Sequence, residues 1–269
     1  MIKKKIQLID THAHLDFPEL FSRIDEVLKN AKSNNVCKIV TISTNLNKIN
    51  KIIKIAENNP EVFFTVGVHP NEVSKDINFI NYELMKKLSS HPKCVGIGEG
   101  GLDYFYGYNN QEKQKQSFLT QIKVSRDTNL PLVIHARDAD DDMIEILNSE
   151  YKQDPFKAIL HCFSSGKKLA ETGIKLGFFI SFSGIVTFNS AKEIQSIAKK
   201  VPLNKILIET DSPYLAPTPI RGTVNEPKNC IHTAKFIAEL KGLAFDDFAK
   251  YTYNNSINVF NKIIARRIK

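Results

Sequence analysis

The chain has 269 residues, of which 42% are hydrophobic and 25% charged. This ordinary globular composition argues against a disordered, collagenous or coiled-coil chain, and the length suits one α/β barrel, so we expect a single domain over residues 1–269. The chain has 37 Lys and Arg residues against 29 Asp and Glu residues, which gives a net charge of +8. This charge favours a polyanionic partner over a cationic one.

The four cysteines lie far apart, at positions 37, 94, 162 and 230, and none forms a C-x-x-C pair. This spacing indicates neither a disulfide framework nor a zinc ribbon and fits reduced thiols inside the cell. The basic residues 3–5 are followed by an apolar run that ends at Asp10, which is too short for an export signal. No apolar stretch approaches the ~20 residues of a membrane span, so we expect a cytoplasmic protein without membrane contact.

Short runs rich in β-branched and aromatic residues recur along the chain and alternate with segments of helical spacing. The predicted strands span residues 6–10, 37–43, 62–68, 94–99, 131–135, 158–161, 178–181 and 206–209. The helical spacing is clear at residues 24–31, 49–56, 169–174 and 194–201. Because strand-helix-strand order requires parallel neighbours, the pattern predicts a closed (β/α)8 TIM barrel, with a doubly wound open sheet as the alternative.

The chain after the eighth predicted strand begins with a proline-rich segment, residues 213–227, where a barrel places a functional loop. Residues 245–264 then predict terminal helices, and residues 265–269 predict a basic, frayed tail. Since no glycine-serine or proline-rich linker divides the chain, these segments belong to the same predicted domain.

Histidines and carboxylates gather at the carboxyl ends of the predicted strands. A barrel brings these ends to one rim, where active sites form, so the positions indicate a shared site. His12 and His14 are residues i and i+2 of an extended segment and therefore point to the same face. The set comprises His12, His14, His69, Glu99, His135, His161 and Asp211.

Four of these histidines, together with Glu99 and Asp211, form a mixed nitrogen and oxygen donor set suited to two borderline divalent ions. Glu99 has the two oxygens that a ligand shared between two ions needs. Each residue taken alone also has a structural interpretation, as a solvated loop histidine, a core histidine, a surface glutamate or a helix cap. His69 is expected to donate a hydrogen bond to substrate, with a ligand or structural role as the alternatives.

Seven segments in chain order resemble the TatD family of metal-dependent deoxyribonucleases, nearest to its YcfH-like branch. They are DTHAHLD at 10–16, GVHP at 67–70, GEGGLDY at 98–104, HARD at 135–138, LHCFS at 160–164, SFSG at 181–184 and ETDSPYLAP at 209–217. The pair RG at 221–222 and NEP at 225–227 match as well. The resemblance spans nearly the whole chain and implies an amidohydrolase-like (β/α)8 barrel that hydrolyses nucleic-acid phosphodiesters.

The resemblance also implies two divalent ions per subunit, zinc, magnesium or manganese, as cofactors. It implies that His12, His14 and Asp211 bind one ion and that His135 and His161 bind the other. Glu99 is implied to bind both ions. Gly100 departs from the family, whose members usually carry an apolar residue there, and we expect it to loosen the loop without removing a ligand.

For the reaction we hypothesise that a water between the ions loses its proton to Asp211, while Glu99 holds the ions at bridging distance. Arg137 is expected to reach a non-bridging phosphate oxygen and Arg221 the backbone further along, with rim salt bridges as the alternative. The aromatic residues 104–106 are candidates for stacking on a base, with core or rim packing as the alternative.

DNA is the expected substrate, and we expect a monomer without an obligate protein partner. Two other functions stay open at this point. The same donor set suits a binuclear-metal hydrolase of a small amide, ester or lactone, or the protein is a non-catalytic binding module. Retention of all six ligand types argues against the binding module.

Overall fold

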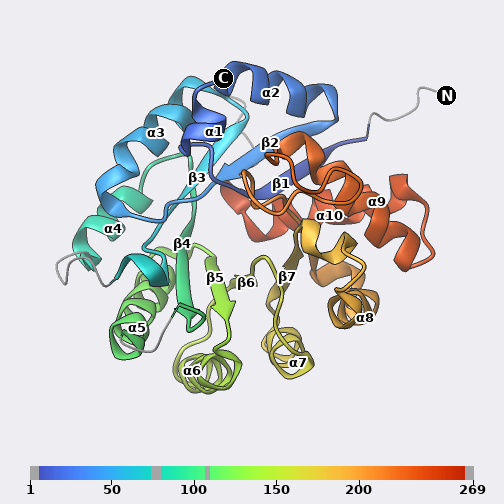
Figure 1. Cartoon of the computed structure of the whole chain (residues 1–269). Helices are drawn as coiled ribbons and strands as arrows, with labels where there is room; N and C mark the ends of the chain where they lie inside the picture. The colour runs from blue at the N-terminus through green and yellow to red at the C-terminus, as the bar shows by residue number, and fades with distance from the viewer. Residues whose placement is uncertain (1–5, 74–79, 107–109, 264–269) are drawn as a thin grey trace.

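The computed structural model describes residues 6–73, 80–106 and 110–263. Its eight parallel strands hydrogen-bond in chain order into one sheet (Figure 1). They are β1 Leu8–Ala13, β2 Val36–Thr41, β3 Val62–Val66, β4 Cys94–Asp103, β5 Leu132–Arg137, β6 Ala158–Leu160, β7 Phe179–Phe182 and β8 Ile206–Ile208. The backbone of β1 also bonds to the chain just beyond β8, at 2.9 Å from Asp211 N to His12 O. The predicted (β/α)8 TIM barrel is confirmed.

Helices surround the sheet (Figure 1). They are α1 Pro18–Phe21, α2 Ile24–Ser33, α3 Ile49–Asn58, α4 Tyr82–Ser89, α5 Gln111–Thr128, α6 Asp140–Gln153, α7 Lys167–Lys175, α8 Lys192–Lys200, α9 Cys230–Leu240 and α10 Phe245–Val259. The four segments with clear helical spacing are confirmed as α2, α3, α7 and α8, and the apolar face of each is buried in the core. Among the described residues, no helix has the length and apolar character to cross a membrane.

The sheet separates two apolar cores, because successive side chains of a strand face opposite sides. The larger core lies between the strands and the helices and includes Phe64, Ile134 and Phe182. The smaller core fills the barrel with one side chain from each strand and with Ile42, the residue after β2. The strand residues are Ile9, Val40, Phe63, Val95, Val133, Ile159, Phe179 and Leu207. Phe260 and Ile263, which follow α10, pack against this inner core and close the barrel below the site.

Strand β4 differs most from the prediction, because it continues beyond residue 99 to Asp103. Gly100 lies within this strand, is buried, and pairs with Ile134 of β5. The expectation that Gly100 loosens a loop is therefore wrong. A Cβ at Gly100 would lie 2.5 Å from Nε2 of Gln121, so an amide of α5 takes the space that a side chain would fill.

The last described residues are helical, as predicted for 245–263, and residue 264 lies outside the described residues. Helix α10 is followed by a short 3₁₀ turn, Asn261–Ile263. The basic residues 3–5 and the expected tail at 265–269 lie outside the described residues.

Candidate metal centre

A cavity of about 1270 Å³ opens at the carboxyl ends of the strands. Its walls include five of the predicted ligands, His14, Glu99, His135, His161 and Asp211. The sixth, His12, is fully buried at the base of the site, with its ring stacked on that of His161 at 3.9 Å between centroids. The strand ends thus bring all six predicted ligands together.

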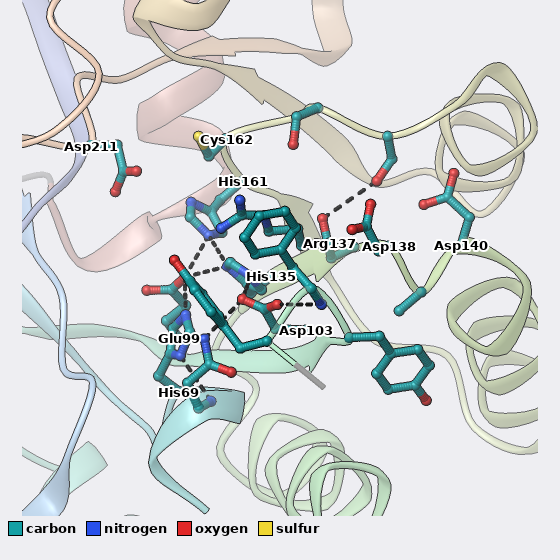
Figure 2. A pocket seen from close by; sticks show the side chains of 18 of the residues that line it. His69, Glu99, Asp103, His135, Arg137, Asp138, Asp140, His161, Cys162 and Asp211 are labelled. Atoms are coloured by element: carbon teal, nitrogen blue, oxygen red, sulfur yellow. Dashed lines mark hydrogen bonds and ion pairs between the residues drawn. The ribbon is translucent and has the colours of Figure 1, made fainter. Parts of the chain in front are cut away.

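Glu99 is the carboxylate that the histidines share, and Figure 2 shows it beside His69, His135 and His161. Its Oε1 is 2.6 Å from Nε2 of His161 and 2.9 Å from Nδ1 of His135. Its Oε2 faces the other pair, at 3.4 Å from Nε2 of His12 and 4.0 Å from Nε2 of His14. The two oxygens of the Glu99 carboxylate therefore face two different pairs of histidines.

Asp211 completes the group around Oε2 of Glu99. Its Oδ1 is 3.3 Å from Nε2 of His14 and 3.5 Å from Nε2 of His12. His69 stands on the other side, where its Nε2 is 3.5 Å from Oε1 of Glu99 and its Nδ1 accepts a hydrogen bond from Asn71 N at 3.1 Å. Neutral His69 therefore carries its proton on Nε2, which faces the site.

The donor set fits cations. Both ring nitrogens of His12 and Nδ1 of His14 are buried and lack a hydrogen-bond partner within the part of the chain that the structure describes. Buried polar atoms are rarely left in this state, so each such atom calls for an explanation such as a bound ion. Two groups of donors lie within 4.8 Å of one another and share Glu99: His12 with His14, and His135 with His161.

Charge coupling between these groups is strong. Burial opposes ionisation of Glu99, but His161, His69 and His12 hold its pKa well below the usual range. Burial also disfavours the charged form of His161, but Glu99 and Glu209 raise its pKa well above the ordinary value. A cation that binds here must displace the proton of His161. Burial lowers the pKa of His69 to about 4, so this ring is neutral at pH 7.

Two carboxylates behind the histidines were missed by the sequence analysis. Oδ2 of Asp103 is 3.2 Å from Nε2 of His135, and Oε1 of Glu209 is 3.3 Å from Nδ1 of His161. Asp103 lies in the family segment GEGGLDY and Glu209 in ETDSPYLAP, so the available signal was a second acidic residue within each segment.

The two arginines lie in different places. Arg137 lines the cavity, and its guanidinium stacks on the ring of Phe105 at 3.6 Å from the centroid. Arg221 lies outside the lining formed by the described residues, and its guanidinium packs over Phe188 at 4.0 Å. The structure thus brings Arg137 to the site and leaves Arg221 outside the cavity lining.

The aromatic candidates also separate. Tyr104 is only 8% exposed and donates a hydrogen bond to Asp142 at 2.6 Å, so it packs in the wall. Phe105 and Tyr106 are 53% and 72% exposed at the mouth of the cavity. Tyr214, which the sequence analysis did not select, is 53% exposed there as well.

One wall of the cavity is acidic. It is formed around the start of α6 by Asp138, Asp140, Asp141 and Asp142. Two of these carboxylates have partners, since Asp140 accepts from Gly166 N at 2.8 Å and Asp142 pairs with Lys115 at 2.9 Å. The net positive charge of the chain is therefore not concentrated at this wall.

Comparison with protein families gives one match over most of the chain. The family model described as TatD related DNase matches residues 9–261. The uncharacterized metal-dependent hydrolase YabD of Bacillus subtilis is 36% identical over 253 residues, which cover 94% of this chain and 98% of the relative. YcfH of Escherichia coli K12, also an uncharacterized metal-dependent hydrolase, is 36% identical over 265 residues and covers 97% and 98%.

Solved structures give the same picture of the fold. YJJV, a TatD homolog from Escherichia coli, superposes with a TM-score of 0.88 at 28% identity and covers 95% of this chain and 98% of its own. An organophosphorus hydrolase from Deinococcus radiodurans has a TM-score of 0.67 at 11% identity, with coverage of 95% and 93%. The second likeness is one of fold alone.

Proposed function

The chain belongs to the TatD family of metal-dependent hydrolases, and on that premise we propose that it is a deoxyribonuclease that cleaves phosphodiester bonds in DNA. The observation that carries the proposal is Glu99, whose two oxygens face two different histidine pairs. This arrangement suits two divalent ions, zinc, magnesium or manganese, with one shared ligand. When bound, such ions supply an attacking hydroxide at neutral pH and positive charge for the phosphate oxygens.

The proposed ligands divide into two sets around Glu99. His12, His14 and Asp211 would hold one ion, and His135 and His161 the other. Because Glu99 is ionised and buried, it is a strong shared donor for both positions. The unpartnered ring nitrogens of His12 support its inclusion.

Asp211 is the proposed proton acceptor. Burial opposes its ionisation, but hydrogen bonding and charge from His14 and His12 lower its pKa, so the carboxylate is charged at neutral pH. Its side chain is 15% exposed and therefore reaches the cavity, unlike that of His12. A charged carboxylate in this position can take a proton from the attacking water.

Substrate contacts would come from the opposite side of Glu99. His69 directs an N–H toward the site because Asn71 occupies its Nδ1, so it can donate to a phosphate oxygen. Arg137 lies on the cavity wall and is the proposed partner of a non-bridging oxygen. The exposed rings of Phe105 and Tyr106 would stack on a base. The position of Arg221 supports only a contact with more distant backbone.

A second candidate function is hydrolysis of a small amide, ester or lactone at the same centre. The acidic wall at the start of α6 favours it, since four carboxylates there would repel a long polyanion. A cytoplasmic monomer remains a prediction in either case. Its four cysteines, all within the described chain, are free thiols, which fits a reducing compartment.

The test is hydrolysis of end-labelled single- and double-stranded DNA with Mg²⁺, Mn²⁺ or Zn²⁺, with and without chelator. A panel of small esters, lactones and amides is run beside it, and Glu99→Gln serves as the control for contaminating nuclease. We expect metal-dependent DNA cleavage that the variant lacks. Turnover of a small ester or lactone with no DNA cleavage would replace the proposal by the second candidate.

A further inference from the structure

Two histidines of the centre turn opposite ring nitrogens toward Glu99. His135 faces Glu99 through Nδ1 at 2.9 Å, and its Nε2 points to Asp103 at 3.2 Å. His161 faces Glu99 through Nε2 at 2.6 Å, and its Nδ1 points to Glu209 at 3.3 Å. Each ring is therefore held between two carboxylates, one inside the site and one behind it. Figure 2 shows this arrangement for His135, which lies between Glu99 and Asp103.

We propose that Asp103 and Glu209 are positioning residues that fix the rings of His135 and His161, so that one presents Nδ1 and the other Nε2 to a metal ion. The inference rests on the ligand roles proposed above and is independent of the DNA substrate. Neither carboxylate is assigned to an ion. Each accepts the N–H on the far side of a ring and thereby leaves the other nitrogen unprotonated for coordination.

Asp103 is held from several directions, as a positioning residue must be. Its Oδ2 accepts from Nδ2 of Asn71 at 2.9 Å and its Oδ1 from Phe105 N at 3.1 Å. The side chain of Gln114 bonds both the N–H and the carbonyl of Asp103, at 2.8 and 2.9 Å. Asp103 lies in β4, four positions beyond Glu99, so the same strand supplies both carboxylates that contact the ring of His135.

Glu209 is more deeply buried. It has no exposed surface, and its Oε1 accepts from Cys162 N at 2.6 Å while it faces Nδ1 of His161. Cys162 follows His161 in the chain, so one carboxylate oxygen contacts both the ring and the adjoining backbone. Rotation of the His161 ring would break the buried contact between its Nδ1–H and Oε1 of Glu209. A buried N–H that loses its acceptor costs free energy, so this contact holds the ring in place.

The experiment measures metal binding and does not depend on activity. Asp103→Asn, Asp103→Ala and Glu209→Gln are titrated with Mn²⁺ by calorimetry, using the full chain freed of metal by a chelator. Asp142→Asn is the matched control for Asp103, because it removes one carboxylate charge from the lining of the same cavity without a contact to either histidine. We expect Asp103→Ala to weaken binding by about 10- to 100-fold, and Asp142→Asn by less than about threefold. Asp103→Asn and Glu209→Gln, which each retain an acceptor oxygen, should fall between these two limits.

Nitrogen NMR of zinc-loaded protein with ¹⁵N-labelled histidine provides a second readout. We expect one ring, that of His135, to carry its proton on Nε2, and that of His161 to carry it on Nδ1. In Asp103→Ala the signal of the His135 ring should change while that of His161 stays. Wild-type Mn²⁺ affinity in folded Asp103→Ala and Glu209→Gln, or zinc bound through the same nitrogen in both rings, would overturn the proposal. Loss of DNA cleavage alone would not bear on it.

Discussion

Gly100→Ala tests the packing between β4 and α5, next to Glu99 of the metal centre. The added Cβ would lie 2.5, 2.6 and 2.7 Å from the three heavy atoms of the Gln121 carboxamide at the end of that side chain. Ordinary contacts between such atoms are about 3.5 Å, so the amide must move by roughly 1 Å. That amide donates to Val68 O at 2.9 Å and accepts from Val68 N at 3.2 Å, and both bonds are buried.

The magnitude follows from those two bonds. A buried polar group left without its partner costs about 1–3 kcal/mol, so two backbone groups of Val68 cost roughly 2–6 kcal/mol. Replacing a glycine in a strand by alanine stabilises the folded state by about 0.5–1 kcal/mol, because alanine loses less conformational entropy on folding. We therefore expect Gly100→Ala to lower the free energy of unfolding by about 1–5 kcal/mol. In a Gln121→Ala background the space is open, so the same substitution should be neutral or slightly stabilising.

The assay is equilibrium urea unfolding of the four proteins of this cycle, followed by circular dichroism and by tyrosine fluorescence. Coincident curves from the two probes justify a two-state free energy. The expected coupling between positions 100 and 121 is at least about 1 kcal/mol. A loss below about 0.5 kcal/mol for Gly100→Ala, or an equal loss in both backgrounds, would refute the steric argument.

Three further substitutions test the site and the loop after β8. Glu99→Gln should abolish turnover and metal binding while the circular dichroism spectrum stays, because an amide lacks two anionic oxygens; near-wild-type turnover would exclude the shared-ligand role. Phe105→Ala should raise KM for single-stranded DNA, equivalent to about 1–3 kcal/mol per stacked base, with a smaller change in kcat; an unchanged KM would remove the stacking contact. Burial opposes ionisation of Glu226, but hydrogen bonds from Arg23 and Lys228 lower its pKa. The ionised carboxylate therefore stabilises the folded protein at pH values above the ordinary pKa of glutamate. This stabilisation is lost as the pH falls through the lower pKa that Glu226 has in the folded protein. Glu226→Gln should lower Tm at pH 7 and flatten its acid dependence, and an unchanged profile would contradict this.

The barrel and its six rim residues were predictable because strand ends in this fold converge, whatever the loops do. The length of β4 was not. Its segment after Glu99 begins with two glycines, which predict a turn, but pairing of Gly100 with Ile134 and of Leu102 with Ala136 in β5 keeps it extended. Tertiary pairing overrides local propensity here, and it carries Asp103 to the ring of His135.

Side-chain direction was the second limit of the sequence. Residues 104–106 share one loop, but Tyr104 turns into the wall toward Asp142 while Phe105 stays at the mouth. Similarly, Arg137 ends β5 and Arg221 lies in the segment after β8, and of these two only Arg137 lines the cavity. Such choices depend on partners distant in sequence, which spacing along one chain does not specify.

The distribution of charge predicts that metal binding and the proposed DNA binding are coupled. The cavity holds the carboxylates of Glu99 and Asp211, both ionised at neutral pH, and the acidic wall that begins at Asp138. A phosphate that approaches these groups is repelled unless divalent cations offset their charge. Metal should therefore control DNA affinity as well as the chemical step, and by linkage DNA should raise metal affinity by the same factor, typically about 5- to 150-fold. Titration of Mn²⁺ with and without a hydrolysis-resistant phosphorothioate oligonucleotide measures this coupling. Equal Mn²⁺ affinity in both titrations would mean that the polynucleotide does not contact the metal centre.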